Sequence, residues 1–203
     1  MVGSGQDPLL WGTPAPDIVR GLADLQTESA RTRKLPPVEE WNPPFCGHLD
    51  IRIGVDGTWF YLGTPIGRPA LVRLFSTILR REVDGAFVLV TPVEKVGITV
   101  EDSPFMAVRV DATLNGREQM LEFTTNVGDR VLAGPDNPLR IEFRGPECEP
   151  RPYILVRGGL EARIARAVFY ELVGLAEEKL TADGRELGVW SGSAFFSLGS
   201  PDP

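Results

Sequence analysis

Two stretches of the chain repeat one pattern of apolar and polar residues. Each begins with an apolar run that predicts a strand, continues through a break containing glycine, and ends in an amphipathic helix. The first copy runs from Trp59 to Leu79, and the second starts 94 residues later and runs from Tyr153 to Val173. At this offset the helix stripes align Leu74 with Val168, Phe75 with Phe169, and Ile78 with Leu172. The pattern therefore predicts two related strand–turn–helix units.

Helical spacing of apolar residues predicts three helices, over 15–33, from Arg68 or Pro69 onward, and over 160–180. Proline suits the start of the second helix because the first helical N–H groups have no partner within the helix. Arg80 and Arg81 are expected at its C-terminal end, where positive charge complements the helix dipole.

Alternating runs separated by turn dipeptides predict nine or ten short strands. The strongest signal is Asp56–Gly57 between two such runs, and Asn115–Gly116 gives a second hairpin. The expected strands are 49–55, 58–62, 86–90, 96–100, 105–114, 120–125, 139–143, 153–157, 187–190 and 194–198.

The order of these elements indicates an α+β fold. Strands cluster around two internal helices and do not alternate strictly with them, as a doubly wound nucleotide-binding sheet would require. We expect two small subdomains, built from a repeated strand–turn–helix–strand motif with mostly antiparallel sheets. The predicted organisation is an N-terminal extension and helix over 1–34, a first subdomain over 35–145, and a smaller second subdomain over 146–203.

Composition narrows the class of partner. The net charge of −7 and the pI of about 4.9 argue against nucleic-acid binding, which usually needs a basic face. Two distant cysteines cannot make a disulfide scaffold, so a reduced cytoplasmic protein is expected. We find neither a signal-peptide pattern nor an apolar run of about 18 residues, and therefore expect no membrane partner.

The two glycine-containing breaks are the candidate ligand site. Gly63, Thr64 and Arg68 precede the first helix, where backbone N–H groups favour anions. Arg157, Gly158 and Gly159 form the matching break in the second unit, and the two breaks facing each other would hold a small acidic ligand. The alternative is that the glycines only allow the chain to turn and that each arginine pairs with a local carboxylate.

Three other groups of residues carry weaker chemical signals. Cys46, His48 and Asp50 alternate, so on one strand they would face the same side and offer zinc ligands or an activated thiol. Spacing of 6–7 Å between such neighbours makes one metal awkward to reach, and ordinary strand-edge residues are the alternative. His48 is the only histidine, which argues against a hydrolase triad.

Carboxylates and a proline-rich segment complete the candidates. Glu94 beside Lys95 would suit acid–base work if buried, although such a pair is more often a solvated ion pair. Glu94 with Glu101 and Asp102 would suit Mg²⁺ or Ca²⁺, although acidic pairs are common on surfaces. The segment 35–45 excludes helix, and its aromatic residues Trp41 and Phe45 are expected to pin it to the body or to bind a partner.

Motifs in order along the chain resemble one known family. They are CGHLDI, DGTWFYLGTPIGRPALVRLFSTILRREVDG, LVTPVEKVGITVEDSPF, PYILVRGGLEARIARAVFYELV and GVWSG, within residues 35–198. Together they resemble the proteobacterial domain-of-unknown-function family 1285. The resemblance implies a two-part α+β structure with repeated motifs and a signalling or regulatory role, and it carries over no catalytic residues.

The expected function is therefore that of a non-enzymatic ligand-binding or regulatory protein without a cofactor, which holds a small anionic ligand between its subdomains. One alternative is a protein–protein interaction module that uses the Pro- and Trp-rich N-terminal segment. The other is a hydrolase or metal enzyme that depends on Cys46 and His48.

Overall fold

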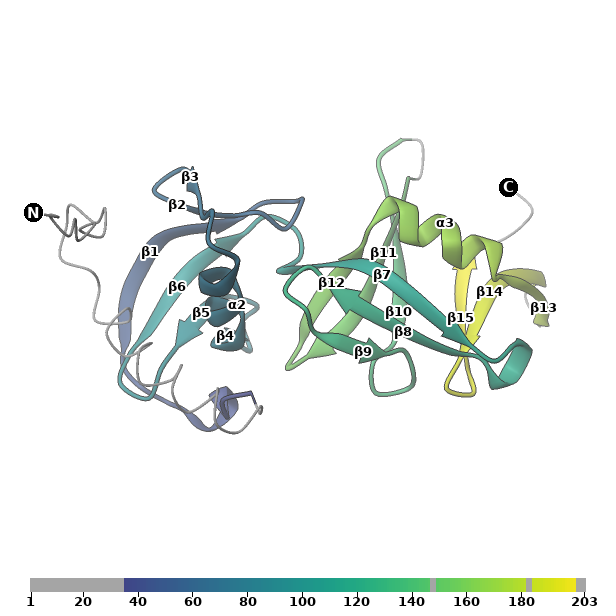
Figure 1. Ribbon diagram of the computed structural model, residues 1–203, viewed down its shortest axis with the longest axis horizontal. Coiled ribbons are helices and arrows are strands. Elements are labelled where there is room, and N and C mark those ends of the chain that lie inside the picture. The colour runs from purple at the N-terminus through teal and green to yellow at the C-terminus, as the bar shows by residue number, and fades with distance from the viewer. Residues whose placement is uncertain (1–34, 147–148, 182–183, 200–203) are drawn as a thin grey trace, which may run out of the picture.

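A computed structural model describes residues 35–146, 149–181 and 184–199. The helix expected over 15–33 lies outside these residues. The described chain forms two lobes side by side along the long axis, each with a curled mixed sheet and one α-helix (Figure 1). The expected α+β class, with two subdomains and mostly antiparallel pairing, is confirmed in this broad form.

The N-terminal lobe is a six-stranded sheet with the order β3-β2-β1-β6-β5-β4. Only the pairing of β1 with β6 is parallel among these strands. Its elements are the 3₁₀ turn η1 (Val38–Glu40), β1 (Phe45–Ile53), β2 (Trp59–Tyr61), β3 (Thr64–Pro65), α2 (Pro69–Thr77), β4 (Leu79–Arg81), β5 (Phe87–Val90) and β6 (Lys95–Val100).

Helix α2 starts at the expected proline but ends earlier than the sequence predicts. Leu74 and Phe75 are buried, and the Phe75 ring stacks on Trp59 with centroids 6.1 Å apart. The expected continuation through Arg81 is wrong, because residues 79–81 form β4 and pair with β5. Leu and Arg are good helix formers, so pairing with a neighbouring strand overrides the local helix propensity of this segment.

The C-terminal lobe has a second six-stranded sheet with the order β10-β11-β12-β7-β8-β9, and a three-stranded sheet β13-β14-β15. In the larger sheet only β12 and β7 are parallel. Its elements are β7 (Phe105–Thr113), η2 (Gly116–Glu118), β8 (Met120–Thr125), β9 (Arg130–Leu132), β10 (Leu139–Arg144), β11 (Glu149–Arg157), β12 (Leu160–Ile164), α3 (Arg166–Gly174), β13 (Glu177–Thr181), β14 (Gly184–Ser191) and β15 (Ala194–Gly199).

The helix expected over 160–180 is wrong at both ends. The segment 160–180 contains strand β12, helix α3 and strand β13 in succession. Burial alternates along β12, where Leu160, Ala162 and Ile164 are buried and the residues between them are half-buried. This period of two is typical of a strand. The helix begins only after Ala165, which caps α3.

The repeated unit therefore holds only in outline. Both copies run hairpin, helix, strand, as β2–β3–α2–β4 and as β11–β12–α3–β13. The position-for-position match is not confirmed, because Arg163, which the offset pairs with Pro69, lies in β12. Val173, paired with the buried Leu79, is exposed.

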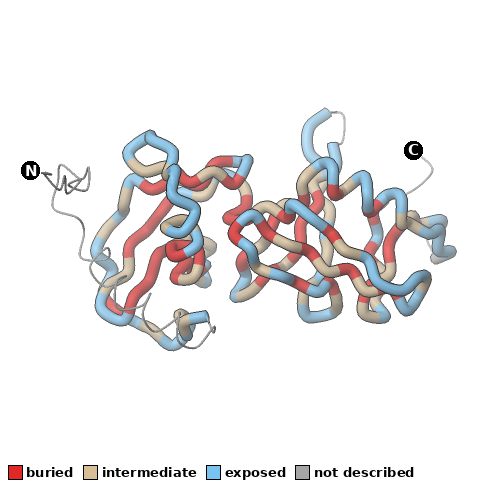
Figure 2. Tube along the Cα trace, viewed as in Figure 1, coloured by how far each residue is buried: buried red, intermediate tan, exposed pale blue. Residues whose placement is uncertain are grey.

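The lobes meet at the linker 101–104, between β6 and β7. The boundary expected after residue 145 falls between β10 and β11, which pair with each other in one sheet. Buried apolar residues of both lobes belong to one connected core, visible as the inner red segments of the trace (Figure 2).

The proline-rich segment lies on the N-terminal lobe. Trp41 packs against the core, as expected, whereas Phe45 is exposed. The buried guanidinium of Arg80 donates hydrogen bonds to the carbonyl oxygens of Val38 and Trp41, both at 2.7 Å. The backbone N–H of Lys95 also donates to the carbonyl of Pro44 at 3.1 Å, so one apolar contact and three hydrogen bonds hold the segment.

Candidate functional site

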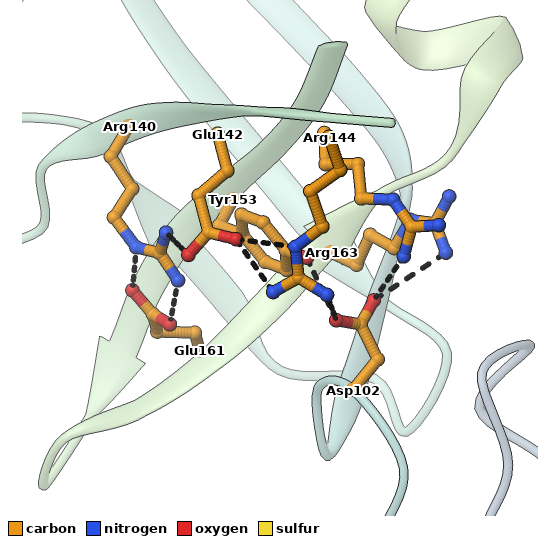
Figure 3. Close-up of polar contacts among 8 residues, drawn as sticks. Asp102, Arg140, Glu142, Arg144, Tyr153, Glu161 and Arg163 are labelled. Carbon is orange, nitrogen blue, oxygen red and sulfur yellow. Dashed lines mark hydrogen bonds and ion pairs between the residues drawn. The ribbon is translucent and has the colours of Figure 1, made fainter. Parts of the chain in front are cut away.

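Four arginines gather on one face of the β10–β11–β12 sheet (Figure 3). We call them the arginine cluster: Arg140, Arg144, Arg151 and Arg163. Register explains the gathering, because Tyr153 of β11 lies opposite Arg140 on one side and Arg163 on the other. Alternate residues of a strand share a face, so neighbours two positions away join the same surface.

Asp102 of the linker reaches this face from outside the sheet (Figure 3). Its side chain is only 4% exposed, and its carboxylate accepts a 2.8 Å hydrogen bond from the hydroxyl of Tyr153. The guanidinium groups of Arg163, Arg144 and Arg151 lie 3.4, 3.6 and 4.0 Å from the same carboxylate. One buried carboxylate is thus shared among three cations.

The rest of the cluster is closely paired. Arg140 donates both Nε and Nη2 to the carboxylate of Glu161 at 2.5 Å, and Nη1 to Glu142 at 2.5 Å. Glu142 also accepts hydrogen bonds from Arg144, whose Nε lies 2.8 Å away. The Arg140 guanidinium lies over the Tyr153 ring, 4.3 Å from its centroid.

Charge is unevenly distributed across this face. Two glutamates, Glu142 and Glu161, form ion pairs with Arg140 and Arg144. Among the described residues, Arg151 and Arg163 have only the shared Asp102 as an ion-pair partner. The Nε of Arg151 is buried and has no hydrogen-bond partner there. Such a donor ordinarily costs free energy unless another group satisfies it, so this part of the face suits an additional acceptor.

Ionisation follows from these contacts. Burial, and then the hydrogen bond to Asp102, raise the pKa of the Tyr153 hydroxyl. Hydrogen bonds from Arg140 and then Arg144 hold the pKa of Glu142 below its ordinary value. Guanidinium groups stay protonated at any physiological pH, so the cluster can bind and orient anions but offers no proton shuttle.

The lowered pKa of Glu142 predicts a pH dependence. Its pairing stabilises the fold fully above the ordinary value of 4.5, and this contribution is lost as pH falls through the lower folded-state pKa. We expect the free energy of unfolding to fall further between pH 7 and pH 3 in the unmodified protein than in Glu142→Gln, as measured by urea denaturation. Equal losses would show that this pairing adds nothing to stability.

The first predicted break lies on the surface. Gly63 lies in the exposed turn between β2 and β3, Thr64 is the exposed first residue of β3, and Arg68 is an exposed residue that caps α2 without a side-chain hydrogen bond to the helix. Gly63 has a φ of 74°, which only glycine adopts easily, so the turn accounts for this residue.

The second break joins the two lobes. Arg157 pairs with Asp129, donates to the carbonyl of Ser76 on α2 at 2.8 Å, and lies over the Phe105 ring. The carbonyl of Gly159 accepts a hydrogen bond from the Arg81 guanidinium at 3.4 Å. Gly158 lies next to Glu39 of the proline-rich segment.

Within the described residues, no hydrogen bond or ion pair connects Gly63, Thr64 or Arg68 with Arg157, Gly158 or Gly159. A shared ligand site between the two breaks stays a prediction. Arg157 already has partners from both lobes.

The cysteine–histidine group lies on β1. Cys46, His48 and Asp50 are exposed, and the register of β1 against β6 shifts on both sides of His48. The imidazole lies against the backbone of Gly97. In the part of the chain that the structure describes, no three His, Cys, Asp or Glu side chains gather as a metal site.

The other carboxylates have separate structural contacts. Glu101 pairs with Arg52 at 2.5 Å and accepts the backbone N–H of Val55 at 3.1 Å, both in the N-terminal lobe. Lys95 pairs with Glu82 at 3.5 Å. The adjacent acids Glu101 and Asp102 are thus bound to opposite lobes.

Sequence reasoning missed the arginine cluster although a signal was present. In β10 the charged residues of Leu139–Arg144 alternate strictly with apolar ones, and Glu161 and Arg163 alternate in the same way. Assigning the latter two to a helix placed them on a different element. Correctly assigned, the three neighbouring strands would have presented their charges on one face.

Comparison with solved structures finds two proteins that are similar to this chain. A DUF1285 family protein from Silicibacter pomeroyi DSS-3 is 53% identical, with a TM-score of 0.78, over 86% of this chain and 94% of that one. A second, from Shewanella baltica OS155, is 27% identical, with a TM-score of 0.47, over 62% of this chain and 91% of that one. No curated protein matches the chain.

Within the described residues, no helix has the length and apolar character needed to cross a membrane. Two family models match in succession, one for the N-terminal domain of a domain of unknown function, DUF1285, over residues 36–103, and one for the C-terminal domain of the same family over residues 104–198. These matches divide the chain at the linker that joins the two lobes. The chain therefore belongs to the DUF1285 family, as its motifs and its similarity to the Silicibacter pomeroyi protein both indicate.

Proposed function

We propose that this protein is a non-enzymatic regulatory protein that binds a small anionic ligand at the arginine cluster. The observation that carries the proposal is the shared carboxylate of Asp102, which is the only described partner of both Arg151 and Arg163. An incoming carboxylate or phosphate would supply the acceptors that these two guanidinium groups lack.

Physical chemistry favours an anion over other ligands here. Arginine presents several N–H donors in a planar fork that matches carboxylate and phosphate oxygens, and such charge-assisted hydrogen bonds are stronger than neutral ones. Arg144, at 50% side-chain exposure, is accessible from solvent, whereas Arg151 and Arg163 are at 28% and 27%. An anion could therefore approach the cluster from the side of Arg144 and reach the less exposed guanidinium groups of Arg151 and Arg163.

The proposal keeps the ligand class expected from the sequence and places it on the C-terminal lobe. The two glycine-containing breaks remain the alternative location. Arg157 supports the new placement, because its contacts with Asp129 and Ser76 already account for its charge and donors.

Isothermal titration with inorganic phosphate, sulfate and succinate at fixed ionic strength tests the proposal. We expect at least one of them to bind, and Arg151→Ala/Arg163→Ala to weaken that binding about tenfold or more, since each lost charge-assisted hydrogen bond is worth about 1.5–3 kcal/mol. Loss of two cations also changes the net charge, so a control must match it.

The matched control is Arg109→Ala/Arg130→Ala. Both arginines are well exposed and pair with carboxylates outside the cluster, Asp111 and Glu122. We expect binding to be unchanged in this variant. If no anion binds, or if both double variants weaken binding equally, the cluster is not the site.

A further inference from the structure

Asp102 occupies the position that an anionic ligand would take. We propose that Asp102 is an internal, displaceable occupant of the arginine cluster, and that a ligand with two anionic charges displaces it and releases the linker between the lobes. The inference rests on the proposed function and adds to it the class of ligand and the regulation of the site.

Distances around Asp102 support displacement. Only the Tyr153 hydroxyl makes a hydrogen bond of ordinary length to this carboxylate, whereas the three guanidinium groups lie 3.4–4.0 Å away. Charge-assisted hydrogen bonds of optimal geometry are about 2.7–2.9 Å long. Asp102 therefore neutralises the arginines without filling their hydrogen-bonding capacity.

The linker connects this carboxylate to both lobes. Glu101 is bound to the N-terminal lobe through Arg52 and through its own backbone N–H, which donates to the carbonyl of Ile53 at 3.0 Å. Ser103 donates its hydroxyl to the carbonyl of Glu161 on β12 at 2.6 Å. Loss of the Asp102 contacts would remove the central attachment of three consecutive residues.

Hydrogen bonds away from the linker also connect the two lobes, and they do not depend on Asp102. Arg73 of α2 donates to the carbonyl of Val127 at 2.9 Å, and Asn126 donates to the carbonyl of Gly57 at 3.3 Å. These bonds hold the lobes together while the linker is released. The expected change is therefore a local rearrangement at the linker with the lobes still joined.

The class of ligand follows from its competition with the Asp102 carboxylate for the arginine cluster. A tethered carboxylate acts at an effective concentration in the millimolar range, so a free monocarboxylate of similar strength would rarely replace it. A phosphate monoester or a dicarboxylate carries more charge and more acceptor atoms, and it can satisfy Arg151 and Arg163 together. Displaced Asp102 regains water, so neither state leaves a buried charge without a partner.

Titration of Asp102→Asn with inorganic phosphate tests the displacement. Asparagine keeps the size of the side chain and an oxygen acceptor for Tyr153, but it removes the competing charge. We expect phosphate to bind about tenfold more tightly than to the unmodified protein, because the tethered competitor is lost. Asp129→Asn, which removes a carboxylate at the joint with Arg157, is the matched control and should leave phosphate affinity unchanged.

A second variant protects the test against misfolding. Tyr153→Phe keeps the charge of Asp102 but removes its 2.8 Å hydrogen bond, and it should raise phosphate affinity several-fold. Hydrogen–deuterium exchange supplies an independent readout, since phosphate should speed exchange of the Glu101 amide in the unmodified protein. Ligands that merely rigidify a protein slow exchange instead.

The outcomes separate the two proposals. Phosphate binding that is no tighter in Asp102→Asn or Tyr153→Phe, with slower exchange at the linker, would overturn the displacement and leave the anion site standing. No binding of phosphate, sulfate or succinate to any variant would overturn both.

Discussion

Arg80→Ala is expected to lower the free energy of unfolding by about 3 kcal/mol, the largest single effect that we predict. The Arg80 side chain is 8% exposed and donates to two backbone carbonyls and to the carboxylate of Glu82. Alanine would leave all three acceptors without this donor. It would also remove two of the hydrogen bonds that hold the proline-rich segment on the N-terminal lobe.

The ion pair between Arg80 and Glu82 also affects the pKa of Glu82. Burial raises this pKa, but the hydrogen bond and charge of Arg80, together with Lys95, hold it below its ordinary value. Removing Arg80 should therefore raise the pKa of Glu82 and reduce the share of stability that is lost as this carboxylate is protonated in acid.

Urea denaturation followed by tryptophan fluorescence measures the Arg80 effect. Arg109→Ala is the control, because Arg109 is exposed and its solvent-screened pairing with Asp111 should contribute little to stability. Arg80→Lys keeps the charge without the fork of donors and should lie between the two. A loss no larger than that of the control would mean that Trp41 and the backbone hydrogen bond at Pro44 hold the segment without Arg80.

Arg157→Ala should have the second largest effect, a loss of about 2 kcal/mol concentrated at the contact between the lobes. The side chain is 22% exposed and holds Asp129, the Ser76 carbonyl and the Phe105 ring together. Without it, α2 loses a polar bond to the C-terminal lobe. The lobes should then unfold less cooperatively.

Differential scanning calorimetry measures this loss of cooperativity as a broadened or split transition. Arg130→Ala, whose partner Glu122 lies within the same lobe, should leave a single transition. Phosphate titration of Arg157→Ala also separates the two candidate sites. Unchanged affinity supports the arginine cluster, whereas lost affinity would place the ligand at the glycine-containing breaks.

Local signals predicted the hairpins well. Asp56–Gly57 connects β1 with β2, and Asn115–Gly116 lies between β7 and β8, although η2 widens that connection. Turn residues act through their own backbone conformations, so the neighbouring sequence is enough to place them. The start of α2 at Pro69 is predictable for the same reason.

The helix expected over 160–180 shows where a local pattern fails to predict the structure. Leu160, Ile164, Val168 and Leu172 are spaced four apart, and all four are buried. This spacing satisfies the period of a helix and also the period of two in a strand. Only pairing of β12 with β7 and β11 decides that the first two belong to a strand.

By itself, the sequence determined the α+β class, the two-part organisation and most of the strands, because these depend on short-range alternation and turn chemistry. Tertiary structure alone decided which charges meet. Asp102, Arg144 and Arg163 lie on different segments, and only strand register and the path of the linker bring the two guanidinium groups within 3.6 and 3.4 Å of the Asp102 carboxylate. Register is set by pairing partners far apart in the chain, so the alternation of charges within each strand, although visible in the sequence, does not show which strands lie side by side.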